Sequence, residues 1–198
     1  MLRNVRRAGG TTAIALLLGL SPAYTAHASE TSSIEAEATE LQPGRFIWRP
    51  QAATEGQVEV VVSLPQQLAY VYRGDTLIGL STVSTGREGH ETPTGSFEIL
   101  QKRERHFSNR YNNAPMPFMQ RLTWDGIALH AGAIPGTPAS HGCVRFPMAF
   151  ARNLYQVTQL GAKVHIVNAD IRDTAMILAY ARRGFEAGDV QLAGGVSD

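Results

Sequence analysis

Apolar residues recur at every second position in the stretch Val58, Val60 and Val62, which is the pattern of a β-strand. Residues 68–72 and 76–80 are further β-rich runs, and Arg-Gly-Asp at 73–75 separates them. Two β-rich runs on either side of a glycine-containing turn predict a hairpin. We expect residues 81–83 to extend its second strand.

The later part of the chain adds more strands and few helices. Residues 94–100 and 162–167 each predict one strand, and residues 122–130 predict a strand, a turn and a second strand. Residues 147–159 and 173–184 have the apolar spacing of helices. The sequence therefore predicts a mainly β domain with one or two packed helices.

The first 28 residues have the three parts of a secretory signal peptide. Three arginines precede an apolar run at 11–20, and Ala-His-Ala at 26–28 forms a small-x-small cleavage site. The apolar run is shorter than the roughly 20 residues that a spanning helix needs. We therefore expect cleavage after Ala28 and export, with the periplasm as the expected location.

The remaining chain divides into three parts. Residues 29–56 are acidic or small at many positions and predict a flexible lead-in. Residues 57–168 carry the strand pattern and predict the folded domain, and residues 169–198 predict a C-terminal helix with a disordered tail. Loss of residues 1–28 with their three arginines would change the formal net charge from +1 to −2. This balance argues against a nucleic-acid partner.

Cys143 is the only cysteine of the chain. In an exported protein this thiol would meet an oxidising compartment without an internal partner for a disulfide. A chemical role is the simplest reason to retain it, although a packed core thiol is the alternative. A single cysteine also excludes a tetrad of cysteine metal ligands, and no metal or organic cofactor is expected.

Two histidines precede Cys143 and could remove its proton. His141 lies two residues before it, and in an extended segment both side chains would lie on one face. His130 is separated from it by a Gly- and Pro-rich loop that could bring the two together. Gly142 allows a close backbone approach, and successive N–H groups in such a turn could hold an oxyanion. The spacing therefore predicts a Cys–His nucleophile pair.

Residues 140–145 read Ser-His-Gly-Cys-Val-Arg, with His130 upstream. This block resembles the catalytic motif of the L,D-transpeptidase (YkuD-type) family. A second block at 84–95 resembles the family segment that ends in Thr-Pro-x-Gly. The resemblance covers residues 57–168 and implies an L,D-transpeptidase-like β-sandwich or barrel-like sheet domain.

The resemblance also implies a role for each matching position. Cys143 would be the nucleophile and His130 the general base and acid, with the carbonyl of Ala131 orienting its imidazole. The remaining matches are the oxyanion-hole N–H groups of His141, Gly142 and Cys143, and the substrate-binding residues Arg145 and Ser140. The sequence departs from the family at Phe146-Pro147, where many members have a polar residue followed by Asn.

The implied reaction is a two-step acyl transfer on peptidoglycan stem peptides. A thioester would form at the third stem residue, and an amine would resolve it into a 3→3 cross-link. Resolution by water would make an L,D-carboxypeptidase, and resolution by a protein amine would anchor that protein to the wall. The resemblance further implies acylation by carbapenems, and we expect a monomer. Another cysteine acyl-transferase, such as a sortase-like enzyme, and a non-catalytic wall-binding module are the alternatives.

Other chemically active residues have simpler interpretations. His90 and His106 are expected to be solvated, and His165 is expected to be structural or at the surface. Residues 109–119 predict either a lid or a plain connection. Three aromatic residues could stack on substrate but are more often core: Tyr111, Phe118 and Trp124.

Overall fold

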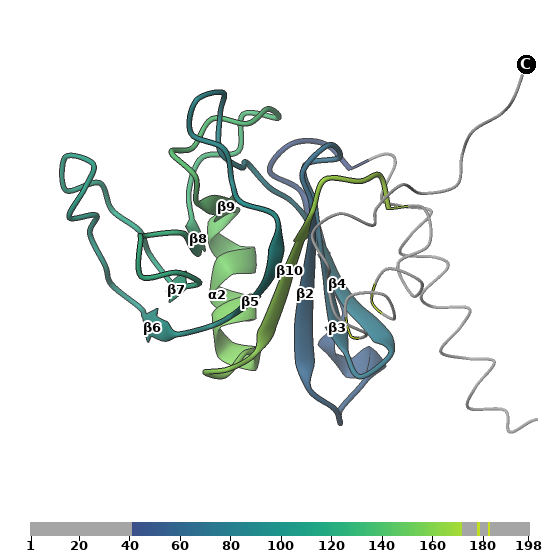
Figure 1. The fold of residues 1–198 in the computed structure, drawn as a ribbon. Helices are drawn as coiled ribbons and strands as arrows, with labels where there is room; N and C mark the ends of the chain where they lie inside the picture. The colour runs from purple at the N-terminus through teal and green to yellow at the C-terminus, as the bar shows by residue number, and fades with distance from the viewer. Residues whose placement is uncertain (1–40, 172–177, 179–181, 183–198) are drawn as a thin grey trace, which may run out of the picture.

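A computed structural model of the chain describes residues 41–171 together with Leu178 and Arg182 (Figure 1). The larger of two sheets has six strands, in the spatial order β1 (Phe46–Trp48), β4 (Thr76–Thr82), β3 (Leu68–Arg73), β2 (Val58–Ser63), β10 (Lys163–Val167) and β5 (Gly95–Glu98). The smaller sheet has four, in the order β6 (Gln101–Arg103), β7 (Met119–Arg121), β8 (Ala128–Ala131) and β9 (Val144–Phe146). The helix α2 (Met148–Val157) lies between the two sheets in Figure 1.

Most neighbouring strands are antiparallel, but two pairs are parallel. β10 pairs with β2 in parallel, and α2 lies in the connection from β9 that leads to β10. β8 pairs with β9 in parallel, and residues 132–143 make the crossover between them. A parallel pair needs a long connection of this kind. Here the connection carries the Cys143 segment to the start of β9.

The main hydrophobic core lies between the two sheets and includes Phe150 and Leu154 of α2. A second cluster covers the outer face of the larger sheet, where Ile171 and Leu178 pack against side chains such as Tyr70. As a result all six residues of β2 are buried, rather than every second one.

The strand predictions are largely confirmed. β2, β3 and β4 match the predicted runs, and the hairpin turns at Gly74, whose φ is +58°. β5, β10 and α2 also lie where the pattern placed them. The mainly β architecture with the packed helix α2 agrees with the predicted fold class.

Two predictions need correction. The first strand of the 122–130 region is β7, which ends at Arg121, and residues 122–127 form the connection to β8. The flexible lead-in over 29–56 is wrong for its later part, because β1 pairs with β4 and residues Pro50–Ala52 form a 3-10 helix (η1). Phe46 and Trp48 supply the cause, since both pack edge-on against Phe150.

Several predictions concern residues outside the described ranges. These are the signal peptide at 1–28, the lead-in up to residue 40 and the tail from residue 183. The predicted helix at 173–184 is described only at Leu178 and Arg182, both of which are helical. Within the described ranges, no helix has the length and apolar character required to span a bilayer.

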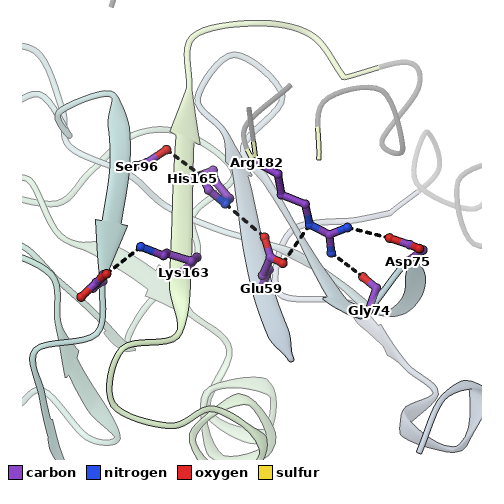
Figure 2. A network of polar contacts seen from close by, with 8 residues as sticks. Glu59, Gly74, Asp75, Ser96, Lys163, His165 and Arg182 are labelled. Atoms are coloured by element: carbon purple, nitrogen blue, oxygen red, sulfur yellow. Dashed lines mark hydrogen bonds and ion pairs between the residues drawn. The ribbon is translucent and has the colours of Figure 1, made fainter. Parts of the chain in front are cut away.

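A polar network crosses the outer face of the larger sheet (Figure 2). Glu59 on β2 and His165 on β10 are both buried, and His165 Nε2 lies 3.4 Å from the Glu59 carboxylate. His165 Nδ1 lies 2.8 Å from the hydroxyl of Ser96 on β5. Burial lowers the pKa of His165, and the bond to Glu59 opposes this effect. His165 is therefore structural, as predicted, but buried rather than at the surface.

Arg182 closes this network from the C-terminal segment. Its Nε donates to the Glu59 carboxylate at 2.9 Å, and its two terminal nitrogens donate to Asp75 at 2.6 Å and to the Gly74 carbonyl at 2.8 Å. A buried carboxylate without a cationic partner is strongly destabilising. The contact therefore holds Arg182 against the sheet.

We predict that Arg182→Met lowers the free energy of unfolding by about 1–2 kcal/mol, because Glu59 loses its cationic partner while it remains buried. This is less than a fully buried pair would lose, since the Arg182 side chain is 36% exposed. Urea denaturation followed by circular dichroism measures the loss. Asp75→Asn is the control, because the Asp75 side chain is 91% exposed and its removal should cost less than about 0.5 kcal/mol. Equal losses in the two variants would contradict the role of Glu59.

Candidate active site

The parallel pairing of β8 and β9 brings the predicted catalytic residues together. His130 is the register partner of Arg145, and Cys143 lies two residues before Arg145. Val144 and Phe146, the alternate residues of β9, are fully buried in the core. Side chains alternate between the faces of a strand, so His130, Arg145 and Cys143 lie on the face away from the core.

These side chains line a pocket of about 460 Å³. Much of the remaining wall comes from the β6–β7 connection, including the stretches 108–111 and 114–117. The titratable side chains of the wall are basic apart from Cys143 and Tyr111: Arg110, Arg121, Arg145, His106, His130 and His141. No Asp or Glu of the described residues lines the pocket. This arrangement favours an anionic ligand.

Cys143 is half-buried and lines the pocket. It packs against a small apolar cluster of Met116, Met119 and Ala128, and its thiol donates to the Gly126 carbonyl at 3.4 Å. Burial raises the pKa of the Cys143 thiol. The backbone of Ala128 and the positive charges of Arg145 and Arg121 act in the opposite direction. The thiol is therefore protonated at rest near neutral pH.

His130 has the geometry of a neutral base. It is 8% exposed, and its Nδ1 lies 2.8 Å from the Ala131 carbonyl. A carbonyl accepts only, so Nδ1 carries the proton and the neutral ring keeps a lone pair on Nε2. Burial lowers the pKa of His130 to about 4, with a smaller contribution from Arg145, while the Ala131 bond opposes the shift. The Ala131 carbonyl thus makes the contact that the family resemblance implied.

The Cys143 turn is held by the hydroxyl of Ser140. This hydroxyl donates to the Cys143 carbonyl at 2.5 Å and accepts from the Gly142 N–H at 3.1 Å. Gly142 has φ +107°, which favours glycine, and a Cβ there would lie 2.9 Å from Ile127 Cδ1. Ser140 therefore uses its hydroxyl within the turn. The Gly142 N–H, expected as an oxyanion donor, is occupied by this bond.

The segment 84–92 supports the same turn from the other side. Ser84 and Arg145 exchange two backbone hydrogen bonds of 3.1 and 3.0 Å, and the Arg87 N–H donates to the Ser140 carbonyl at 3.1 Å. The Thr92 hydroxyl donates to the Gly142 carbonyl at 2.9 Å. The sequence analysis assigned no role to Thr92. Its position in the Thr-Pro-x-Gly block was the feature that could have marked it as a site residue.

His141 makes its contacts with residues other than Cys143. Residues 141 and 142 form a bend, so the condition under which His141 and Cys143 would share one face of an extended segment is not met. The Nε2 of His141 lies 2.8 Å from an Arg87 guanidinium nitrogen, and its ring stacks on Tyr111 with centroids 4.4 Å apart. The His90 ring meets it edge-on at 4.8 Å. His141 and Tyr111 thus form part of the pocket wall, and Arg87 and His90 contact His141 without lining the pocket.

Three further expectations are settled by the structure. His106, expected to be solvated, lines the pocket, and burial lowers its pKa. Trp124, expected in the core, is 74% exposed, and the Arg121 guanidinium lies 5.9 Å from its ring centroid. Phe118 packs at the core edge against Tyr155. Across the described ranges, no group of three or more His, Cys, Asp or Glu has the arrangement of a metal site.

Comparison with solved structures shows the same fold in several L,D-transpeptidases. The protein from Stackebrandtia nassauensis is 23% identical, with a TM-score of 0.54 over 73% of this chain and 67% of its own. Those from Mycobacterium tuberculosis and Mycobacterium smegmatis are 22% and 18% identical, with TM-scores of 0.54 and 0.53 over 57% and 56% of this chain. The match covers 58% of the length of each mycobacterial protein.

Searching the curated proteins gave no match. The family model of the L,D-transpeptidase catalytic domain (YkuD) matches residues 57–166, which is more than half of the chain. That range includes the two paired strands, the Cys143 turn and the 84–92 segment. This chain therefore belongs to the family of L,D-transpeptidase catalytic domains.

Proposed function

We propose that this protein is an exported peptidoglycan L,D-transpeptidase that works through a thioester on Cys143. The observation that carries the proposal is the placement of Cys143 and a buried neutral His130 on one face of two paired strands. Membership of the family supports the substrate class. The basic pocket wall supports it independently, because stem peptides carry carboxylates.

In the first half-reaction His130 Nε2 takes the proton of the Cys143 thiol as the sulfur attacks the carbonyl carbon between the third and fourth stem residues. The attack and the proton transfer are coupled, since both groups are neutral at rest. The oxyanion is held by backbone N–H groups of the turn, with the Cys143 N–H as the main donor. The C–N bond then breaks, His130 protonates the leaving D-residue amine, and the thioester remains.

In the second half-reaction an amine attacks the thioester carbonyl. His130 accepts the amine proton and returns a proton to the departing sulfur, which restores the neutral pair. A side-chain amine of a neighbouring stem peptide yields a 3→3 cross-link. Water yields a trimmed stem peptide, and a protein amine yields an anchored protein.

Arg145 is the proposed contact for a substrate carboxylate. It lies beside His130 in register and lines the pocket. Its stem packs over Gly132, where a Cβ would lie 2.9 Å from Arg145 Cδ. The absence of a side chain at Gly132 therefore leaves room for the arginine against the pocket wall.

We expect export to the periplasm, with action as a monomer. The support for export is the signal-peptide pattern of residues 1–28. A single cysteine fits an oxidising compartment when its thiol is protonated and half-buried, because thiolate character governs oxidation.

We predict that the wild-type protein gains the mass of imipenem on incubation with the drug and that Cys143→Ala gains none. One solved L,D-transpeptidase, 20% identical, is a complex with imipenem, and another, from Mycobacterium tuberculosis and 21% identical, carries a faropenem-derived adduct. Intact-mass spectrometry measures the adduct. Absence of an adduct on wild-type protein whose Cys143 is shown to be reduced would contradict the proposal.

We predict that incubation with a disaccharide-tetrapeptide releases the terminal D-residue and forms a cross-linked dimer, because the stem peptide supplies both donor and acceptor. Liquid chromatography with mass spectrometry measures both products. Release of the D-residue without any dimer would identify an L,D-carboxypeptidase. Neither product should form with Cys143→Ala.

We predict that the rate of imipenem acylation is retained as the pH falls from 7 to 5 and is lost only near pH 4. The rate depends on neutral His130, and burial lowers the pKa of His130 to about 4 from the ordinary value near 6.5. Stopped-flow measurement over this range gives the profile, with circular dichroism to verify that the protein stays folded. An acidic limb centred between pH 6 and 7 would contradict the assignment of His130.

A further inference from the structure

Thr92 is a buried polar residue that contacts the Cys143 turn without lining the pocket. It is 4% exposed, and its hydroxyl donates to the Gly142 carbonyl at 2.9 Å. The same oxygen accepts the Gly86 N–H at 2.8 Å. The hydroxyl therefore both donates and accepts, and the bond that it donates goes to the residue before Cys143.

The Gly142 carbonyl and the Cys143 N–H belong to one peptide unit. A trans peptide is planar, and its N–H points opposite to its carbonyl. The Thr92 bond directs that carbonyl toward a buried residue that does not line the pocket. The Cys143 N–H therefore points away from Thr92, on the residue whose side chain lines the pocket.

Thr92 and Ser140 bind different peptide units of the turn, and the unit between Gly142 and Cys143 is bound by Thr92. The Gly142 N–H donates to the Ser140 hydroxyl, and the Cys143 carbonyl accepts from the same hydroxyl. Ser140 thus holds the peptides before and after, whereas Thr92 holds the one between them. The absence of a side chain at Gly86 keeps Thr92 close, since a Cβ there would lie 2.0 Å from the His90 carbonyl and 2.7 Å from the Thr92 nitrogen.

We propose that Thr92 is a positioning residue that aims the Cys143 N–H at the oxyanion formed during acyl transfer. The inference rests on the proposed function, because it assumes that Cys143 attacks a carbonyl. It assigns Thr92 no contact with substrate. Loss of its hydroxyl should slow reactions that pass through an oxyanion and spare reactions of the same sulfur that do not.

Two reagents separate these effects in the full-length protein. Imipenem is attacked at its lactam carbonyl, so an oxyanion forms before the C–N bond breaks and the ring nitrogen takes a proton. Iodoacetamide is attacked at a saturated carbon, so a C–S bond forms, iodide leaves, and no oxyanion arises. Thr92→Val removes the hydroxyl at nearly constant shape, and Thr92→Ser retains it. The second-order rate constants of both reagents are measured for wild type and both variants.

The expected result is a loss of about 10- to 100-fold in the imipenem rate of Thr92→Val, since deletion of a whole oxyanion donor costs on the order of 100- to 1,000-fold. Its iodoacetamide rate should stay within about twofold of wild type, and Thr92→Ser should keep both rates within about threefold. An unchanged imipenem rate in Thr92→Val would overturn the inference. So would an equal loss with both reagents, which would indicate a general disruption of the turn.

The same data test the proposed function separately. Wild-type protein that reacts with iodoacetamide but not with imipenem would overturn the acyl-transfer proposal and the role of Thr92 with it. Wild-type protein that reacts with both, beside a Thr92→Val variant that does the same at wild-type rates, would overturn the role of Thr92 alone.

Discussion

The parallel pairing of β8 and β9 is the constraint on which the site depends. Each strand has only three or four residues, and short strands are not stable by themselves. Their alternate side chains, including Val144 and Phe146, are buried in the core, and α2 begins directly after β9. Burial of one face therefore fixes the register, and the register sets His130 beside Arg145 on the other face. The backbone bonds of the 84–92 segment then secure the turn that β9 continues.

Within this arrangement the low polarity around the site sets the charge state of its two central groups. Burial raises the pKa of Cys143 and lowers the pKa of His130, so both shifts favour the uncharged pair. An ion pair of thiolate and imidazolium would need stabilisation from the surrounding dipoles. The charge of Arg145 lowers the pKa of both groups, which favours the thiolate but opposes the imidazolium. Under the proposed function, the sulfur would therefore become reactive only as a substrate carbonyl accepts its electrons.

Local sequence patterns were sufficient to predict the elements that depend on contacts between neighbouring residues in the chain. The alternation at β2, the glycine turn at Gly74 and the apolar spacing of α2 each reflect contacts within a short stretch. The Cys143 block likewise predicted a site shared with His130, and both residues line the pocket. Burial of Glu59 could not be predicted in this way, because its partner Arg182 lies more than a hundred positions later in the sequence. Thr92 and His106 were missed for the same reason, since their neighbours in the structure are distant in sequence.

The position of β10 has a consequence for when the chain can fold. This strand, at 163–167, lies between β2 at 58–63 and β5 at 95–98, so the larger sheet is divided until it is added. Contacts between segments so far apart in sequence form slowly, because a long loop must close before they are made. A ribosome that has synthesised only the first 150 residues has therefore produced a chain without a continuous sheet. In such a nascent chain β2 and β5 lack the strand that joins them until residues 163–167 have been released.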